Sequence, residues 1–242
     1  MDVVFILVAP SRPANVGAVA RAMKTQGFAQ LRIVASEAHL DEEAHWVAHG
    51  AQELLAEATH YESAEQALSD CDLVVATTAR RRGCVRDYWE PQQVQQQLAA
   101  KSEQLGRVAI LFGCEESGLP NELIDQADLL SCIPLAQPQP SLNLAQAAMV
   151  YAFALAPLAS LSNTAELDSV DLSRSSTAED PQEQGQWLAL KQRLAQLQNR
   201  LGNDDDAKLS EWLQDRLGLI EGRDIRMLHT LLSNIESALN KP

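Results

Sequence analysis

The sequence predicts an α/β fold, in which helices cover a parallel sheet, followed by a small all-helical C-terminal domain. Short apolar runs, typical of strands buried on both faces of a parallel sheet, alternate with segments of helical pattern. This alternation indicates a layered architecture. Near residue 160 the composition turns polar, and a second helical pattern follows. The strands are expected at residues 3–9, 31–34, 73–77, 108–112 and 130–133.

Helical segments separate or follow these strands. Asn15 is a residue type that caps helices, and a helix is expected to run from it toward Lys24. Ser141 is likewise a good N-cap and precedes an alanine-rich apolar stretch. The further helices of this part are expected at 64–68, 91–100 and 142–155, on the basis of amphipathic pattern and helical propensity.

Composition divides the chain into three parts. Residues 1–159 carry the strand and helix alternation and are expected to form one domain. Residues 160–185 are mostly polar and bury too little apolar surface to fold alone, so they are expected to be a linker. In 186–242 leucines recur at helical spacing, as at Leu190 and Leu194, and predict a three-helix tail. We expect this tail to stabilise the protein or bind a partner.

The bulk composition indicates an ordinary soluble protein. With 242 residues, of which 46% are hydrophobic, the chain can bury a sizeable core. The apolar run at 3–9 follows Asp2 rather than a basic flank, and no run approaches the ~20 residues that span a bilayer. A cytoplasmic location without membrane contact is therefore expected. No CxxC pair is present, so reduced thiols and no metal site are expected at Cys71, Cys84, Cys114 and Cys132.

The formal net charge of −14 argues against a protein that coats nucleic acid by bulk electrostatics. One local basic cluster stands out, because Arg80, Arg81 and Arg82 follow a predicted strand directly and Arg86 comes close behind. A solvated loop that aids solubility is the simpler interpretation of such a run. Its position at a strand end leaves a binding role open.

Three short segments sit at predicted strand-to-helix transitions, where open parallel sheets gather their functional loops. They are Asn15-Val16-Gly17 with Arg21, then residues 112–119 (FGCEESGL), then Ser141-Leu142-Asn143-Leu144. Taken separately, each has a simpler interpretation. In the first, Asn15 can be a helix cap and Arg21 a surface cation; the second can be an ordinary loop; and in the third Ser141 can be a helix cap. The single glycine of the first segment does not fit a GxGxxG dinucleotide turn, so a Rossmann cofactor site is not expected. Together the segments predict one site built from three distant pieces.

In this order and at these separations, NxGxxxR, FGxExxGL and SLNL resemble the three motifs of the SpoU/TrmH-like branch of the SPOUT RNA methyltransferase superfamily. The resemblance covers about residues 1–158 and is strongest to tRNA/rRNA ribose methylases of the TrmJ and LasT type. It implies S-adenosylmethionine as methyl donor, a ribose 2′-hydroxyl of tRNA or rRNA as acceptor, and a homodimer whose active site draws on both subunits. It also implies a C-terminal trefoil knot in the catalytic domain, which general topology rules would not suggest.

The resemblance also assigns roles to individual residues. Arg21 would orient or activate the attacking 2′-hydroxyl, Asn15 and Glu115 would hold the local geometry, and Ser141 and Asn143 would complete the pocket. The donor would lie against Thr77, Thr78, Ala79, Gly113, Ile133, Ser141 and Leu142, without a metal. The basic cluster Arg80, Arg81, Arg82 and Arg86 would then contact RNA phosphates. Because an arginine is normally protonated, electrostatic stabilisation is preferred over general base catalysis for Arg21.

One residue departs from the pattern, because TrmJ-type enzymes commonly carry Arg where this chain has Cys114. The substitution removes a cation near the donor or a substrate phosphate. Our leading hypothesis is a methyltransferase that acts on the ribose 2′-hydroxyl of tRNA or rRNA, with tRNA favoured. The alternative is an RNA-binding protein that keeps the methylase fold with little or no turnover. A flavodoxin-like small-molecule enzyme is disfavoured, because it leaves the joint occurrence of the three motifs to chance.

Overall fold

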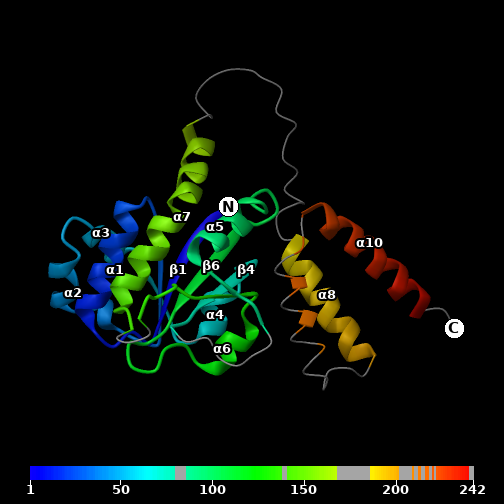
Figure 1. The fold of residues 1–242 in the computed structure, drawn as a ribbon, viewed down its shortest axis with the longest axis horizontal. Coiled ribbons are helices and arrows are strands. Elements are labelled where there is room, and N and C mark those ends of the chain that lie inside the picture. Colours follow the sequence, from blue (N-terminus) through cyan, green and yellow to red (C-terminus); the bar gives the residue numbers. More distant parts are fainter. Residues whose placement is uncertain are drawn as a thin grey trace.

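A computed structural model gives the fold as a seven-stranded, fully parallel sheet with helices on both faces (Figure 1). It describes residues 1–79, 86–137, 141–167, 186–201, 209, 212–213, 216–217, 220 and 222–239. The strands are β1 (Asp2–Val8), β2 (Gln30–Val34), β3 (Thr59–Tyr61), β4 (Leu73–Thr77), β5 (Tyr88–Trp89), β6 (Arg107–Phe112) and β7 (Leu129–Ser131). Their spatial order is β3-β2-β1-β6-β4-β7-β5. The predicted parallel α/β sheet is confirmed.

All five predicted strands are present, although β7 is shifted toward the N-terminus and ends at Ser131. The sequence analysis missed β3 and β5. Both are short edge strands, and none of their residues is fully buried. An apolar run cannot mark such strands, because they pair on one side only and carry polar or aromatic side chains.

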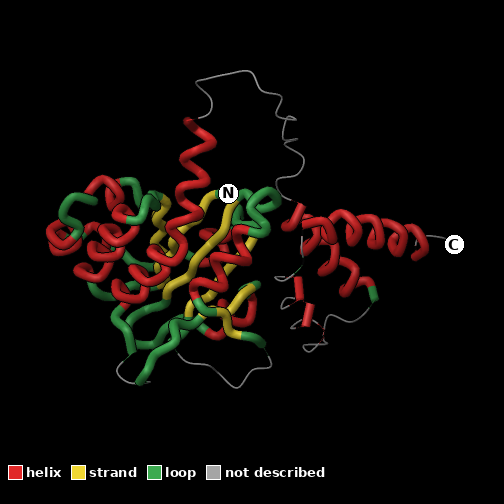
Figure 2. Tube along the Cα trace, turned by 45° about the horizontal axis from the view of Figure 1, so that its top comes forward, coloured by secondary structure: helices red, strands yellow, loops and turns green. Residues whose placement is uncertain are grey.

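The central strands are buried on both faces. In β1, Phe5 and Leu7 pack into one core cluster and Val4 and Ile6 into the other, and all four are fully buried. The first cluster lies under α1 (Pro13–Thr25), α5 (Pro91–Ala99) and α7 (Leu144–Leu167), which pack on the same face of the sheet (Figure 2). The second lies under α4 (Ala64–Leu68) and α6 (Asn121–Gln126).

Three short elements lie beyond β2, at the edge of the domain. They are η1 (Ala38–Leu40), α2 (Glu42–Val47) and α3 (Gln52–Ala56). Helix α2 packs on α1 so closely that a Cβ atom at Gly17 would overlap the carbonyl oxygen of Ala44. Gly17 is therefore the residue that permits this helix contact.

Two helices begin elsewhere than predicted. Arg12 is the N-cap of α1 and Pro13 its first residue, so Asn15 lies inside the first turn. Asn143 rather than Ser141 caps α7, because its side-chain oxygen accepts the backbone N–H of Ala145 at 2.8 Å. A proline at the first helical position is favoured, and it explains the earlier start of α1.

Helix α7 ends at Leu167 instead of near residue 155 and passes through Pro157. Residues 160–167 are thus helical, which corrects the expected start of the linker. Of the expected linker, residues 168–185 lie outside the described residues. None of the helices in the described ranges is both long enough and apolar enough to cross a membrane.

In the tail, α8 (Gln186–Arg200) and α10 (Gly222–Leu239) pack against each other. The guanidinium of Arg193 on α8 donates to Glu236 and Ser233 on α10 at 2.8 and 3.0 Å. Among the described residues between them, Leu209, Trp212, Leu213, Arg216 and Leu217 are helical. The ammonium of Lys191 contacts Asp128, next to β7, at 2.7 Å and joins the tail to the sheet domain.

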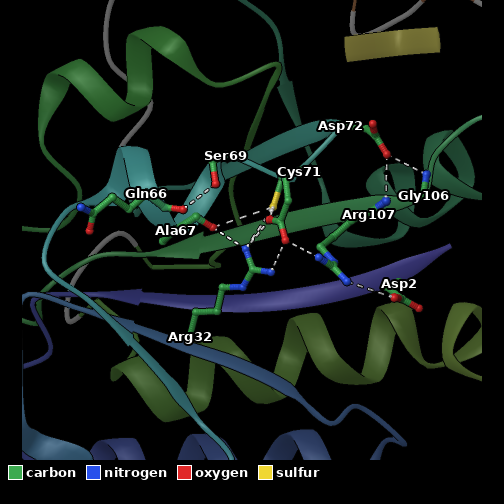
Figure 3. Close-up of polar contacts among 10 residues, drawn as sticks. Asp2, Arg32, Gln66, Ala67, Ser69, Cys71, Asp72, Gly106 and Arg107 are labelled. Carbon is green, nitrogen blue, oxygen red and sulfur yellow. Dashed lines mark hydrogen bonds and ion pairs between the residues drawn. The ribbon is translucent and has the colours of Figure 1, made fainter. Parts of the chain in front are cut away.

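A charged cluster ties the amino ends of the central strands to α4 (Figure 3). The guanidinium of Arg32, of which 7% of the side chain is exposed, donates to both oxygens of Asp70 at 2.6 and 2.9 Å and lies 5.5 Å from the centroid of the Tyr61 ring. Arg107 also pairs with Asp70. The hydrogen bonds from Arg32 lower the pKa of Asp70 to about 2. Burial raises the pKa of the neighbouring Cys71 to about 12, so this thiol is chemically inert.

Asp70→Asn tests this cluster. Because folding lowers the pKa of Asp70 from 3.8 to about 2, the ion pairs stabilise the folded state above the ordinary carboxyl pKa. This stabilisation is lost as pH falls through about 2. We expect the variant to lose about 1–2 kcal/mol of unfolding free energy near neutral pH, a value reduced for the half-exposed carboxylate, and the difference to vanish toward pH 2. Urea unfolding at a series of pH values measures it. An equal loss in Asp87→Asn, an exposed aspartate outside the cluster, would contradict the assignment.

Candidate active site

The three motifs meet at one edge of the sheet. Ser11 and Asn15 follow β1, Gly113 and Glu115 follow β6, and Asn143 opens α7 after β7. Strands β1 and β6 are neighbours, and β1 has its sequential partner β2 on its other side. Ligands of open parallel sheets bind outside the carboxyl ends of the strands at such a reversal of strand order.

Side-chain hydrogen bonds join the motifs directly. The amide of Asn15 donates to Oε1 of Glu115 at 2.7 Å, over 100 residues of sequence. Its Oδ1 accepts a hydrogen bond from the amide of Asn143 at 2.8 Å. The other carboxylate oxygen of Glu115 accepts the backbone N–H and the hydroxyl of Ser11, at 3.0 and 2.9 Å. We call Ser11, Asn15, Glu115 and Asn143 the motif network. The network brings together Asn15, Glu115 and Asn143, as the sequence analysis predicts.

The N-cap of α7 orients Asn143 for this network. Its Oδ1 accepts the N–H groups of Ala145 and Gln146 at 2.8 and 3.3 Å, and Gln146 accepts the N–H of Asn143 at 3.1 Å. This reciprocal arrangement is a capping box, in which the helix end fixes the capping side chain. The amide NH₂ of Asn143 remains available for Asn15.

Burial alone would raise the pKa of Glu115, but the hydrogen bonds from Asn15 and Ser11 together lower it. The carboxylate is therefore ionised at neutral pH and accepts hydrogen bonds only. It donates no proton in the folded protein, so its geometry suits a structural acceptor better than a general acid.

The loop after β6 folds back on itself. The carbonyl oxygen of Cys114 accepts the N–H of Gly118 at 2.8 Å, and the two residues form an isolated bridge. A Cβ atom at Gly113 would overlap the backbone of Gly118 and Leu119, so the returning chain requires glycine there. The fold of this loop holds Glu115 toward α1.

Next to the motif network lies a cavity of about 300 Å³. It is lined by every residue predicted to contact the donor: Thr77, Thr78, Ala79, Gly113, Ile133, Ser141 and Leu142. Glu115 lines it too and connects it to the motif network. Thr77 is held in place because its hydroxyl donates to the carbonyl oxygen of Leu111 at 2.7 Å. That these residues bind a donor stays a prediction.

The cavity has further lining residues that the predicted donor contacts do not include, namely Cys114, Glu116, Ser117, Gly118, Leu119, Leu135, Leu144, Ala147 and Tyr151. Six of them belong to the motif segments 112–119 and 141–144, which the sequence analysis places at the site, whereas Leu135, Ala147 and Tyr151 were missed. The remaining signal was the spacing of Leu144, Ala147 and Tyr151, which places them on one face of α7. Among the residues that the structure describes, no cluster of His, Cys, Asp or Glu could hold a metal ion.

Arg21 lies away from this cavity. It is exposed on α1 and is not among the lining residues. Within the described ranges, no carboxylate pairs with its guanidinium. The structure of one chain therefore does not bring Arg21 to this cavity. Arg80, Arg81 and Arg82 lie outside the described residues.

Arg86 does not lie where the sequence analysis expects it. Only 6% of the residue is exposed, and its guanidinium donates to the carbonyl oxygens of Ile124 and Ala127 at 3.0 and 2.6 Å. These carbonyls belong to the C-terminal end of α6. A cation there donates hydrogen bonds to carbonyl oxygens that have no partner within the helix, and it interacts favourably with the negative end of the helix dipole. The predicted phosphate contact of Arg86 is therefore wrong, and the residue stabilises the fold.

Glu115→Gln tests the motif network. The glutamine side chain keeps one oxygen that can accept a hydrogen bond, but its NH₂ group replaces the other oxygen and faces a hydrogen-bond donor of Asn15 or Ser11. We therefore expect a loss of about 1–3 kcal/mol in unfolding free energy near neutral pH. Because folding lowers the pKa of Glu115, its stabilisation is present above the ordinary carboxyl pKa and is lost as pH falls below it. Chemical unfolding at neutral and acid pH measures both effects. Glu116→Gln, an exposed neighbour in the same loop, serves as control, and an equal loss there would contradict the network.

Comparison with protein families agrees with this geometry. Residues 2–153 match the SpoU rRNA methylase family, and residues 184–239 match the C-terminal domain of the tRNA/rRNA methyltransferase LasT. A protein of Escherichia coli K12, named as an uncharacterized tRNA/rRNA methyltransferase LasT, is 42% identical over 241 residues and all of both chains. The tRNA (cytidine-2′-O-)-methyltransferase TrmJ of Methanocaldococcus jannaschii is 40% identical over 146 residues, which are 60% of this chain and 63% of that protein.

Solved structures also match over nearly the whole chain. TrmJ from Z. mobilis ZM4 matches with a TM-score of 0.66 and 29% identity, over 98% of this chain and 100% of that chain. A probable methylase family protein from Haemophilus influenzae Rd KW20 matches with a TM-score of 0.61 and 26% identity, over 98% and 97% of the two chains. The motif network, the fold and these matches agree: the chain belongs to the SpoU rRNA methylase family of tRNA/rRNA methyltransferases and carries a LasT C-terminal domain.

Proposed function

We propose that the protein transfers a methyl group from S-adenosylmethionine to a ribose 2′-hydroxyl of RNA, with tRNA as the favoured substrate. The observation that carries the proposal is the motif network, which unites three distant motifs beside the cavity. Two TrmJ relatives, from Methanocaldococcus jannaschii and Pectobacterium atrosepticum, are named as tRNA 2′-O-methyltransferases, and these names support the choice of tRNA and of ribose.

The cavity fits a nucleoside-sized donor. Its volume of about 300 Å³ is at the lower end of the range for small-molecule sites. Thr77, Thr78 and Ala79 would form one wall, and Ile133 and Leu142 another. When bound, S-adenosylmethionine supplies a methyl group activated on its sulfonium. The protein's part is to bind this donor and align the hydroxyl with it.

Arg21 has the chemistry that the acceptor requires. A ribose hydroxyl is a weak nucleophile near neutral pH, and negative charge develops on its oxygen as its proton leaves. A guanidinium is a cation with several donors and can stabilise that charge or hold an adjacent phosphate. The hydroxyl proton leaves to water or to a neighbouring phosphate oxygen. Arg21 is thus proposed as an electrostatic stabiliser.

We further propose a homodimer in which Arg21 serves the partner's cavity. Between Leu144 and Ala159, Gln146 is the only polar residue of α7, and Met149 and Phe153 on its outer face are 39% and 68% exposed. A helix with such a pattern is normally buried on every side. Helix α1, which carries the exposed Arg21, packs beside α7. An interface on this face would bring Arg21 near a second copy.

The strand order is compatible with the trefoil knot that the family resemblance implies, and we propose that the knot is present. Strands β4 and β5 are consecutive in sequence, yet β7 lies between them in the sheet. Strand β7 is therefore inserted between two strands that precede it in the sequence. A knot formed by the segment that leads to α7 would be consistent with this order.

Arg21→Ala tests the reaction. We expect the wild-type protein to incorporate label from S-adenosylmethionine into small RNA from cells that lack the protein, with a 2′-O-methylnucleoside as product. Loss of one electrostatic stabiliser should lower kcat by roughly 10²- to 10³-fold, with donor affinity within about twofold, because Arg21 is proposed to act on the acceptor hydroxyl and not on the donor. Nucleoside mass spectrometry identifies the product, and Lys24→Ala on the same helix is the control. A methylated base would contradict the ribose assignment, and donor binding without incorporation would favour the non-catalytic RNA-binding alternative.

Phe153→Glu tests the dimer. A carboxylate in the centre of the apolar α7 face should disfavour association, because burying an unpaired charge costs several kcal/mol. We expect a wild-type dimer and a largely monomeric, folded variant in analytical ultracentrifugation, with activity lost in parallel. Trp46→Glu, at a side chain that is 74% exposed on α2, is the matched control. A wild-type monomer, or a variant that remains dimeric, would contradict the proposed interface.

A further inference from the structure

Tyr151 lines the cavity but has no part in the chemistry proposed above. It lies on α7, is 1% exposed, and its ring meets that of Phe112 edge-on with centroids 5.5 Å apart. The Tyr151 hydroxyl donates to Oγ of Ser131 in β7 at 2.7 Å. A phenylalanine would fill the same space, so the hydroxyl calls for an explanation of its own.

The direction of this hydrogen bond is fixed. The carbonyl oxygen of Trp89 in β5 only accepts, so the hydroxyl of Ser131, 2.8 Å away, must use its single proton there. Ser131 can then only accept from Tyr151. Burial raises the pKa of Tyr151, and its hydroxyl therefore keeps the proton that it donates. One directed chain of hydrogen bonds runs from α7 through β7 to β5.

Ser131 also holds other walls of the cavity. Its carbonyl oxygen accepts the N–H of Thr78, a lining residue, at 2.9 Å. The chain continues from Ser131 through Cys132, whose N–H donates to Trp89, to the lining residue Ile133. The walls that follow β4 and β7 thus both depend on the position of Ser131. The hydrogen bond from Tyr151 connects them to α7.

We propose that Tyr151 is a positioning residue for the methyl donor, because its hydrogen bond to Ser131 fixes α7 against β7 and sets the separation of the cavity walls. The inference rests on the proposed function, since it assumes that the cavity binds S-adenosylmethionine. The Tyr151 hydroxyl itself, already donated to Ser131, need not touch the donor. Its effect should therefore appear in donor affinity rather than in the chemical step.

The test is a double-mutant cycle of Tyr151→Phe and Ser131→Ala in the full chain. Tyr151→Phe keeps the ring and removes one hydrogen bond, so the Kd for S-adenosylmethionine, measured by isothermal titration calorimetry, should rise about threefold to tenfold. The KM for the donor should rise equally, while kcat at saturating donor stays within about twofold. The double variant should bind no more weakly than Ser131→Ala alone, because the two side chains act as a unit.

Tyr61→Phe is the matched control, because Tyr61 is a half-buried tyrosine of β3 outside the cavity. It should leave the Kd unchanged. A Tyr151→Phe variant with a lowered melting temperature but wild-type donor affinity would overturn the positioning role, and so would additive effects in the cycle. A wild-type protein that does not bind S-adenosylmethionine would contradict the proposed function, and the positioning role with it.

Discussion

The carboxylate of Glu115 is the acceptor on which the candidate site depends. The parallel sheet brings the carboxyl ends of β1, β6 and β7 to one edge, but the pairing of strands does not fix the loops beyond them. One oxygen of Glu115 accepts Asn15 and the other accepts both donors of Ser11, while Asn15 holds Asn143. Three connections of different lengths thereby become one rigid unit. Because the carboxylate is ionised and both of its oxygens already accept hydrogen bonds within the chain, its contribution is to geometry.

Two glycines of the motifs allow close packing of the backbone around the site. Gly17 lets α1 approach α2, and Gly113 lets the loop after β6 return over its own start. These close approaches determine how closely α1 packs on α2 and where Glu115 points, so the cavity depends on them indirectly. Arg21, by contrast, is a motif residue that takes no part in this packing and is exposed. The motifs therefore contain residues that shape the site and one residue, Arg21, that does not contact the cavity of its own chain.

The tail is attached at the opposite end of the sheet from the cavity. Asp128 precedes β7, and its carboxylate accepts the N–H of Val74 and the ammonium of Lys191, both at 2.7 Å. Its side chain is 4% exposed, so this ion pair is shielded from solvent. Arg86 binds carbonyl oxygens in the same region, including that of Asp128 at 3.2 Å. This attachment holds the tail against the sheet domain, and the role of the tail in stability, partner binding or RNA binding stays a prediction.

The sequence by itself determined the layered α/β class, the five buried strands and the three motif segments, because apolar runs and motif spacing are local properties of the chain. It also predicted all seven donor-wall residues that line the cavity. Only the tertiary structure decided that Asn143 caps α7, that Arg86 is buried against α6, and that α7 continues to Leu167. The physical reason is that the local sequence does not distinguish between the possible partners of these side chains. An asparagine can cap a helix or join two segments by hydrogen bonds, and an arginine can contact phosphates or backbone carbonyls. Which partner each one finds depends on segments up to 128 residues away.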